Sequence, residues 1–360
     1  MRRLGCLLNV ANFAVHICPS GHFFMKDTQA LKDFLKTPKK IIITTHANPD
    51  ADALGSSLGL EHFLKSEGHS VQTIIPNSYP NFLEWMPGNE SVLNYEESKD
   101  KCDTIITDCD LLFCLDFSGF NRVKNMKEIA SKTPAKIGLI DHHLNPEIKP
   151  DFNFWDDNSA ATAELVYDLI VDFEGKNAIS KEIAECLYAG IMTDTGSFKH
   201  SSTTSKIHRT VAELIDLGVN VNKVSRLIYD TNSLNRLRFM GYALAEKLQV
   251  HTEYQTAFFI IDDEDFDKFD LKQGDTEGLV NYALSIKGIV VAATIIQRSN
   301  EIKMSFRSVG DVAVNKFAEE YFEGGGHKNA AGGTSQLTLK ETEERFKELI
   351  NKNVLNTRIK

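Results

Sequence analysis

The sequence of 360 residues has no long apolar run, because no stretch approaches the ~20 residues that a membrane span requires. Positive charge is also scarce, since 40 lysines and arginines face 50 aspartates and glutamates, giving a formal net charge of -10. Broad binding to long duplex nucleic acid is therefore not expected. A small phosphorylated ligand remains compatible with this charge, because a few nearby lysines, arginines or metal ions could neutralise the phosphate.

Cysteine is sparse, and the six cysteines form no CxxC pair. Several lie in apolar runs, where a free thiol packs like a small hydrophobic side chain. This usage argues against a disulfide scaffold and favours a reducing, cytoplasmic location. With 42% hydrophobic and 25% charged residues, the composition is typical of a globular protein long enough for two domains.

The first 24 residues begin with basic side chains and continue into an apolar stretch, as a signal peptide does. Polar residues interrupt the apolar part, however, and no small-x-small cleavage site follows. Met25 then opens the sequence MKDTQALKDFLK, which has the pattern of a first helix. We therefore expect residues 1–24 to be an extension upstream of an alternative start, with a signal peptide as the less favoured reading.

Strand-like and helix-like segments alternate over residues 25–218. Apolar runs predict strands at 41–45, 71–76, 111–116 and 136–140, and helical patterns fall at 53–66, 121–131, 161–173, 181–192 and 203–218. Such alternation is typical of α/β domains, and it predicts a mostly parallel sheet.

A second, smaller α/β domain is expected over residues 249–360. Its predicted strands are 254–262, 289–297 and 301–308, and its predicted helices are 275–286, 311–322 and 339–352. The intervening residues, 219–248, contain no proline and one glycine. They are expected to form a helical connector between the two domains.

Acidic and histidine side chains recur where the predicted strands and helices end. In chain order they are His46, Asp50, Asp52, Asp116, Asp141, His142, His143 and Asp194. Ligand sites in open α/β sheets form beyond the carboxyl ends of the strands, so the expected fold would gather these residues in one place.

So many carboxylates in one site would repel one another, and divalent cations would remove this repulsion. A mixed set of imidazole and carboxylate ligands without thiolate suits Mn²⁺ or a related ion better than a structural Zn²⁺ site. Two such ions ~3.5–4 Å apart can clamp a phosphoryl group and generate a hydroxide nucleophile. Taken singly, each residue could instead be a packed side chain, a turn residue or a helix cap, as Asp52 could be before Ala53.

The sequence as a whole resembles the DHH phosphoesterase superfamily. The stretches HANPDADALGS, LDFSG, DHH and GIMTDTGSF are similar to its four motifs, and GGGHKNAAGG at 324–333 is similar to the signature of the accompanying DHHA1 domain. The resemblance extends over about residues 39–355. It implies a catalytic DHH domain at 25–218 and a substrate-binding DHHA1 domain at 249–360.

The resemblance implies two bound Mn²⁺ ions, for which Mg²⁺ or Co²⁺ could substitute. The implied ligands are His46 and Asp50 for one ion, Asp52, His142 and Asp194 for the other, and Asp116 for both. The resemblance also places His143 beside the scissile phosphate, as an acid or a transition-state donor. Asp141 would orient the histidines.

The glycine-rich stretch is expected to form a loop that binds an anion. Gly324, Gly325 and Gly326 would let backbone N–H groups approach the anion closely, and His327 and Lys328 would add donors and charge. A helix C-cap followed by a tight turn would need only one glycine. Arg307 matches a family position that contacts the phosphate or the terminal nucleotide of the substrate. Arg298 is a weaker candidate, and either arginine could be an ordinary surface residue.

Within the superfamily, the C-terminal half distinguishes the substrates. Family II pyrophosphatases carry a different C-terminal domain, and RecJ-type exonucleases carry an added OB-fold. Membrane-bound cyclic-dinucleotide phosphodiesterases carry transmembrane segments. None of these features is found in the sequence, so these three subfamilies are disfavoured. The sequence is most similar to the stand-alone nanoRNases, oligoribonucleases that act on short substrates such as pApA and on 3'-phosphoadenosine 5'-phosphate. Cyclic di-AMP hydrolysis, an inert nucleotide-binding module and a homodimeric state are left open.

Overall fold

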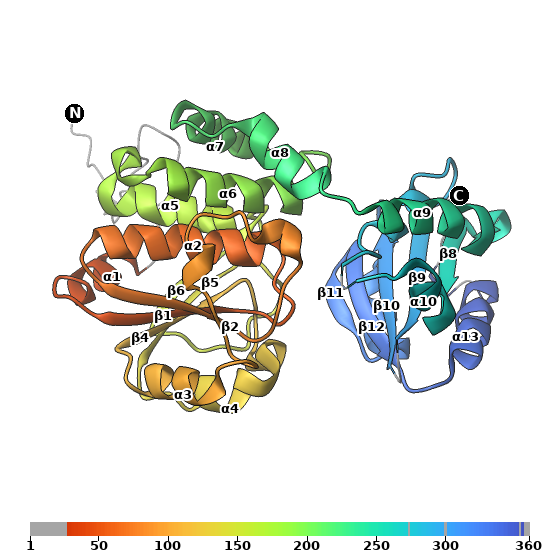
Figure 1. The fold of residues 1–360 in the computed structure, drawn as a ribbon, viewed down its shortest axis with the longest axis horizontal. Coiled ribbons are helices and arrows are strands. Elements are labelled where there is room, and N and C mark those ends of the chain that lie inside the picture. The colour runs from red at the N-terminus through yellow and green to blue at the C-terminus, as the bar shows by residue number, and fades with distance from the viewer. Residues whose placement is uncertain (1–26, 273, 299–300, 353, 356–360) are drawn as a thin grey trace, which may run out of the picture.

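A computed structural model of the protein describes residues 27–272, 274–298, 301–352 and 354–355. The proposed extension at residues 1–24 lies outside these ranges. Two six-stranded sheets form the framework (Figure 1). The strands of the first sheet precede helices α8 (Val221–Tyr229) and α9 (Leu234–Tyr242) in the sequence, and the strands of the second sheet follow them. None of the described helices is both long enough and apolar enough to cross a membrane.

The first sheet is entirely parallel and has the strand order β3-β2-β1-β4-β5-β6. Its strands are β1 (Lys40–Thr45), β2 (Ser70–Ile75), β3 (Leu93–Asn94), β4 (Leu111–Leu115), β5 (Lys136–Asp141) and β6 (Phe152–Trp155). The predicted parallel α/β sheet is thus confirmed. The edge strands β3 and β6 are absent from the predicted pattern because they have only two and four residues, too few to show a period.

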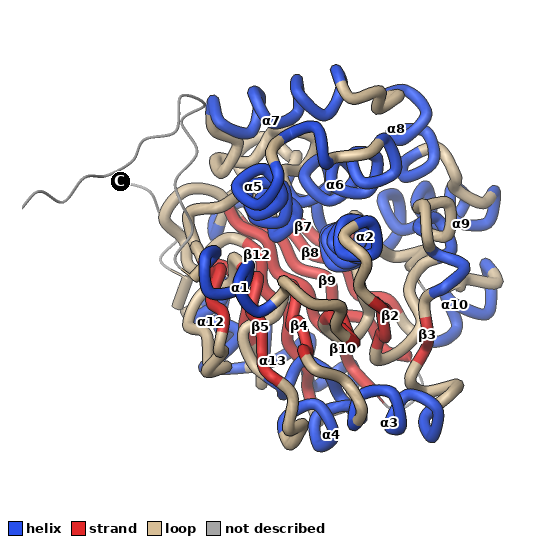
Figure 2. Tube along the Cα trace, turned by 90° about the vertical axis from the view of Figure 1, so that its left-hand side faces the viewer, coloured by secondary structure: helices blue, strands red, loops and turns tan. Residues whose placement is uncertain are grey.

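Helices cover both faces of this sheet (Figures 1 and 2). One face carries α1 (Thr28–Phe34), α2 (Ala51–Ser66), α5 (Thr162–Glu174) and α6 (Lys181–Asp194), and the other carries α3 (Lys99–Thr107) and α4 (Lys127–Ser131). Strand β1 is buried on both faces of the sheet. Ile41 and Ile43 pack in the core with α2, and Ile42 packs in the core with α3. A strand buried on both sides reads as a continuous apolar run, which is why the sequence predicts it well.

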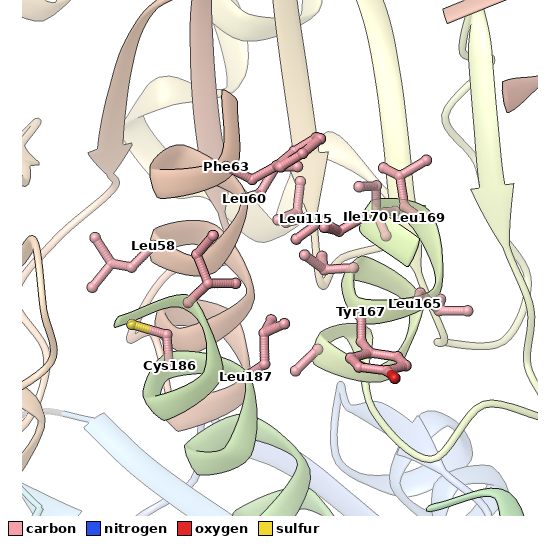
Figure 3. Packing of buried hydrophobic residues seen from close by; sticks show 14 of the residues in the cluster. Leu58, Leu60, Phe63, Leu115, Leu165, Tyr167, Leu169, Ile170, Cys186 and Leu187 are labelled. Atoms are coloured by element: carbon pink, nitrogen blue, oxygen red, sulfur yellow. The ribbon is translucent and has the colours of Figure 1, made fainter. Parts of the chain in front are cut away.

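Helix α2 packs closely against α6 in the larger core, where Leu58 lies near Cys186 and Leu187 (Figure 3). A Cβ atom placed on Gly55 would lie 2.4 Å from the carbonyl oxygen of Cys186. Only glycine permits this approach of the two helix backbones. The contact matters for the site below, because α2 begins beside Asp50 and α6 ends at Asp194.

The substitution Gly55→Ala is expected to lower the free energy of unfolding by about 1–3 kcal/mol, because the new methyl group meets a backbone oxygen that cannot rotate away. Gly241→Ala is the matched control: Gly241 also lies in a helix, but nothing is found within 4 Å of an added Cβ. That change should be neutral or stabilising by ~0.5–1 kcal/mol. Chemical denaturation measures both, and equal effects would contradict the close packing.

Two helical segments depart from the predicted pattern. The helix expected at 121–131 is a 3₁₀ segment at Phe120–Met126 followed by the short α4, because Lys124 has a φ of 44° that interrupts the helix. Helix α3 is missing from the prediction, since Cys102 and Ile106 are the only buried residues in its sequence. Helix α7 (Ser205–Asp216) is confirmed.

The connector is not one continuous helix. Helix α8 ends at Tyr229 and α9 begins at Leu234, where the Ser233 side chain caps the new helix by accepting the N–H of Arg236. A π-helical segment, Ala243–Lys247, then leads directly into strand β7. The polar residues between α8 and α9 account for the break, because serine and asparagine favour helix caps and turns.

The second sheet has the order β11-β12-β10-β9-β8-β7 and is antiparallel except for the parallel pair β8–β9. Its strands are β7 (Leu248–His251), β8 (Thr256–Ile261), β9 (Val291–Arg298), β10 (Glu301–Ser308), β11 (Gly325–His327) and β12 (Ala330–Ser335). Helices α12 (Val314–Tyr321) and α13 (Leu339–Asn351) share a core with one face, and α9, α10 (Asp263–Phe269) and α11 (Leu279–Leu284) with the other. The three predicted strands are confirmed.

Four cysteines fall within the described residues, and all four are free and buried: Cys102, Cys109, Cys114 and Cys186. Burial raises the pKa of each thiol, to about 11 for Cys109. These thiols therefore behave as packing groups, as the sequence indicates. Cys6 and Cys18 lie outside the described residues.

Candidate metal centre

Three adjacent strands of the first sheet deliver the predicted residues to one edge. His46 follows β1, Asp116 follows β4, and β5 ends at Asp141 and is followed by His142. The order β1-β4-β5 makes these strands neighbours. The side chains converge because parallel strands place their carboxyl ends on the same edge of the sheet.

Asp50 is both a helix cap and a candidate ligand. Its Oδ1 accepts the backbone N–H groups of Asp52 and Ala53, both at 3.0 Å, and so caps α2. Its Oδ2 lies 3.9 Å from Nε2 of His46. The two roles use different oxygens and do not exclude each other. The alternative reading of Asp52 as the cap is wrong, because Asp52 lies in the first turn of the helix.

Asp52 is held by the start of helix α5. Its two oxygens accept the backbone N–H groups of Thr162 at 2.7 Å and of Ala163 at 2.9 Å, and the residue is 1% exposed. Burial, together with the negative charge of Asp116, raises the pKa of Asp52 well above its ordinary value. The helix N-terminus thus fixes a carboxylate whose charge the protein compensates only in part.

Asp116 lies between the two histidines. Its Oδ2 is 3.4 Å from Nε2 of His46, and its Oδ1 is 3.6 Å from Nε2 of His142 and accepts the hydroxyl of Thr162 at 2.8 Å. The backbone of Asp116 has a φ of 63°, a left-handed conformation that is uncommon outside glycine and often found at functional sites. Burial acts to raise the pKa of this carboxyl, but His46 and the charges of the neighbouring imidazoles hold it below its ordinary value.

Both histidines point the same ring atom at the carboxylates. Nδ1 of His46 lies 2.9 Å from the carbonyl oxygen of Ala47, and Nδ1 of His142 lies 3.2 Å from that of Ser159. A carbonyl oxygen only accepts, so Nδ1 carries the proton and Nε2 of a neutral ring carries the lone pair. For His142, Nε2 also lies 3.3 Å from Oδ2 of Asp194. A lone pair that faces a carboxylate is repelled by it, and either a proton on Nε2 or a metal ion between the two groups removes this repulsion.

The site therefore has the donor set of a metal centre. The donor atoms of His46, Asp50 and Asp116 lie within 4.8 Å of one another, and so do those of Asp52, Asp116 and His142. The two groups share Asp116. Within the described part of the chain, the ion pairs of these carboxylates involve histidine alone. Burial raises the pKa of Asp194 to about 7, although the charge of His142 acts against this shift. This cluster can hold divalent ions.

His143 is held by the buried carboxylate of Asp141. Oδ1 of Asp141 lies 2.8 Å from Nδ1 of His143 and accepts the backbone N–H of the same residue at 3.1 Å. Burial opposes protonation of the ring, but the contact with Asp141 and the charge of Asp116 outweigh it and raise the pKa of His143 to about 9. The ring therefore carries a proton at neutral pH, and Nε2 is left for another partner.

The second unit contributes His327 and Arg307 to the same place. The ring of His327, from β11, stacks on His143 with centroids 4.7 Å apart and lies 5.3 Å from the ring of His142. Burial and the charges of these two rings lower the pKa of His327 to about 4. Burial also lowers the pKa of Arg307, while the charge of Asp194 opposes the shift. Arg307 thus lies within electrostatic reach of Asp194.

The glycine-rich stretch is a strand pair rather than the expected loop. Residues 325–327 form β11, which pairs with β12 at the edge of the second sheet. A Cβ on Gly324 would lie 2.1 Å from the Gly332 oxygen, and one on Gly326 would lie 2.6 Å from the Ala330 oxygen. Close packing in the hairpin thus explains two of the three glycines. Gly325 has open space, with its nearest contact at 3.9 Å.

The other two basic candidates have partners elsewhere. The ammonium group of Lys328 binds Oδ1 of Asp311 at 2.8 Å, and the guanidinium of Arg298 lies over the Phe266 ring at 5.2 Å. Thr162, by contrast, contacts both Asp52 and Asp116, and the sequence analysis misses it. The small residues of NSAATAEL, which spans the start of α5, are the signal that could have found it, because they let the helix start approach the site.

Comparison with known proteins gives matches over most of the chain. The family profile "DHH family, N-terminal domain" matches residues 40–191, and the profile "DHHA1 domain" matches residues 247–356. Two curated relatives are named "Bifunctional oligoribonuclease and PAP phosphatase NrnA". The one from Thermus thermophilus is 33% identical over 86% of this chain and 89% of its own length. The one from Bacillus subtilis is 28% identical over 82% and 88%.

A solved structure has the same fold over nearly the whole chain. It is the crystal structure of an exopolyphosphatase-related protein from Bacteroides fragilis, with a TM-score of 0.89 and 38% sequence identity. The match covers 92% of this chain and 97% of that one.

Proposed function

Because this chain belongs to the DHH family and carries a DHHA1 domain, it is a phosphoric ester hydrolase, and we propose that it hydrolyses short nucleotide phosphoesters with divalent cations. The proposed substrates are short oligoribonucleotides such as pApA, and 3'-phosphoadenosine 5'-phosphate. Relatives named for this pair of activities align with most of the chain, which supports the choice. We propose Mn²⁺ as the ion, with Mg²⁺ or Co²⁺ as substitutes.

The observation that carries the proposal is the pair of donor sets that share Asp116. The proposed ligands are His46 and Asp50 for one ion, Asp52, His142 and Asp194 for the other, and Asp116 for both. Divalent cations held there would neutralise charge on a phosphoryl group and activate water for attack on it.

The protein's own groups bind the substrate and move a proton. His143, with Nδ1 fixed by Asp141, presents Nε2 for proton donation to the oxygen of the leaving group. Arg307 binds a phosphate or the terminal nucleotide, and His327 lies between the two units as a further donor. In this proposal residues 25–218 perform the chemistry, residues 249–360 hold the substrate end, and residues 219–248 join them.

The proposal is tested by assaying the purified protein on pApA, longer oligoribonucleotides, 3'-phosphoadenosine 5'-phosphate and cyclic di-AMP. Each assay contains Mn²⁺, Mg²⁺, Co²⁺ or a chelator. We expect mononucleotide release from pApA and phosphate release from 3'-phosphoadenosine 5'-phosphate with Mn²⁺, and none with the chelator. Preference for cyclic di-AMP would move the proposal to that substrate, and inactivity on all four would favour an inert binding module.

Arg307→Ala should weaken the use of nucleotide substrates by about 1.5–3 kcal/mol, typical for a hydrogen bond to a charged group. It should leave the slow hydrolysis of bis-p-nitrophenyl phosphate largely unchanged, because that substrate has no terminal nucleotide to bind. Arg298→Ala is the matched control, since its guanidinium packs on Phe266. The measurement is kcat/KM for pApA and for the artificial diester. An equal fall for both would place Arg307 in the chemistry or the fold.

A further inference from the structure

The segment at the start of helix α5, residues 159–163, contacts the ligands proposed for one of the two ions. The carbonyl oxygen of Ser159 lies 3.2 Å from Nδ1 of His142. The backbone N–H of Thr162 donates to Oδ2 of Asp52 at 2.7 Å. Ser159 and Thr162 are both buried. We call this stretch the α5 entry segment, and a shift of it would move the imidazole and the carboxylate together.

The ligands proposed for the other ion are held elsewhere. Nδ1 of His46 lies 2.9 Å from the carbonyl oxygen of the next residue, Ala47, and Asp50 caps helix α2 through its Oδ1. Asp116, the shared ligand, accepts the hydroxyl of Thr162 and so has one contact with the α5 entry segment. The two ion sites therefore differ in what fixes their ligands, and one of them depends mainly on that segment.

The buried carboxylate of Glu164 holds the α5 entry segment in place. Its Oε2 accepts both the hydroxyl of Ser159 at 2.6 Å and the backbone N–H of Ala160 at 2.8 Å. Its Oε1 lies 2.8 Å from the ammonium group of Lys206, in α7, which also contacts Asp168. The Glu164 side chain is only 4% exposed. A carboxylate this buried needs a charged partner, and Lys206 supplies it.

A glutamate in the first turn of a helix is commonly no more than a cap, and Glu164 occupies that position. Two observations go beyond this role. A cap at the surface needs no partner from another helix, yet Glu164 is buried and paired with Lys206. The residue that it binds, Ser159, uses its carbonyl oxygen for the ring of His142. The chain of contacts from Lys206 to His142 is therefore continuous.

We propose that Glu164 is a positioning residue that sets the affinity of one of the two ions and has much less effect on the other. The affected ion is the one assigned to Asp52, His142 and Asp194. This inference rests on the proposed function, in which two ions are bound. Glu164 acts through its hydrogen bonds to the α5 entry segment. Contacts of this kind behind metal ligands typically contribute about 10- to 100-fold to metal affinity.

The test is a titration of the full-length protein with Mn²⁺ alone, in which electron paramagnetic resonance measures the free ion. Glu164→Ala should raise one of the two dissociation constants by about 10- to 100-fold and the other by less than about threefold. Glu164→Gln keeps the side-chain length and one oxygen that can accept both hydrogen bonds, so its effect should be small. Glu164→Asp keeps the charge opposite Lys206 but is one methylene too short, so its effect should approach that of alanine.

The order of the two conservative variants separates positioning from charge pairing. If aspartate preserves the affinity better than glutamine, the charge pair with Lys206 is what matters, and the inference is overturned. This comparison also stands if Glu164→Ala is insoluble. Glu185→Ala is the matched control, because Glu185 is likewise a buried glutamate paired with a lysine, Lys223. It should leave both dissociation constants unchanged.

Two backgrounds identify the affected ion. In His46→Ala, which lacks a ligand of the other ion, adding Glu164→Ala should weaken the remaining site by about 10- to 100-fold. In Asp194→Ala the same addition should have less than about a threefold effect. Equal weakening in both backgrounds, or in Asp194→Ala alone, would contradict the proposal. Failure of the proposed function gives a different result, since wild type itself would then bind fewer than two Mn²⁺ ions.

Discussion

Asp116→Ala is expected to lower kcat for pApA by several orders of magnitude while the fold is retained. The carboxylate lies 3.4 Å from Nε2 of His46 and 3.6 Å from that of His142, so it belongs to both donor sets. Any ion held in either set loses a ligand, and the two sets lose the group that fixes their separation.

The fold should survive because the lost attraction between Asp116 and the histidines is offset by the end of its repulsion with Asp52 and Asp194. Among the described residues, one hydroxyl donates to its side chain, that of Thr162, and the loss of this hydrogen bond costs about 0.5–1.5 kcal/mol. Asp108→Ala is the control, since this aspartate lies just before β4 and pairs with Lys40 on the exposed side. The measurements are Mn²⁺-dependent turnover, circular dichroism and thermal unfolding. Near-normal turnover in the Asp116 variant would contradict the two-ion assignment.

The sequence predicts which acidic and histidine side chains converge at the candidate metal centre, because these residues follow strong signals. Strands β1, β4 and β5 are apolar runs, and a polar residue directly after such a run lies at the carboxyl end of a buried strand. The strand order then brings these polar residues together, since β1, β4 and β5 are neighbours in the sheet. That order is itself a set of long-range pairings, which the apolar runs do not predict and the structure supplies.

Contacts between distant segments are what the sequence does not predict. Asp52 receives its hydrogen bonds from Thr162 and Ala163, which lie 110 and 111 residues further along the chain. Gly324 and Gly326 look like a flexible loop in sequence, but the β12 backbone packed against them explains both. The sequence alone does not distinguish a glycine that is needed for close packing from one that is needed for the approach of a ligand, whereas the structure does.

His143→Ala is expected to lower kcat for pApA by about 10²- to 10⁴-fold, the usual contribution of a positioned general acid. Asp141 holds Nδ1 of the ring at 2.8 Å, and the pKa of about 9 leaves the ring protonated at neutral pH. Cleavage of pApA expels a ribose oxygen, which is strongly basic and leaves only with a proton. The loss should therefore depend on the leaving group.

Bis-p-nitrophenyl phosphate separates this role from metal binding, because p-nitrophenolate leaves without protonation. His143→Ala should affect its hydrolysis far less than that of pApA, and Asp141→Asn should show the same pattern with smaller losses, since it disturbs the ring only through its partner. His251→Ala is the control, because that ring stacks on Phe258 in the second unit. If His143→Ala slows both substrates equally, the histidine holds an ion or the fold, and another group must supply the proton.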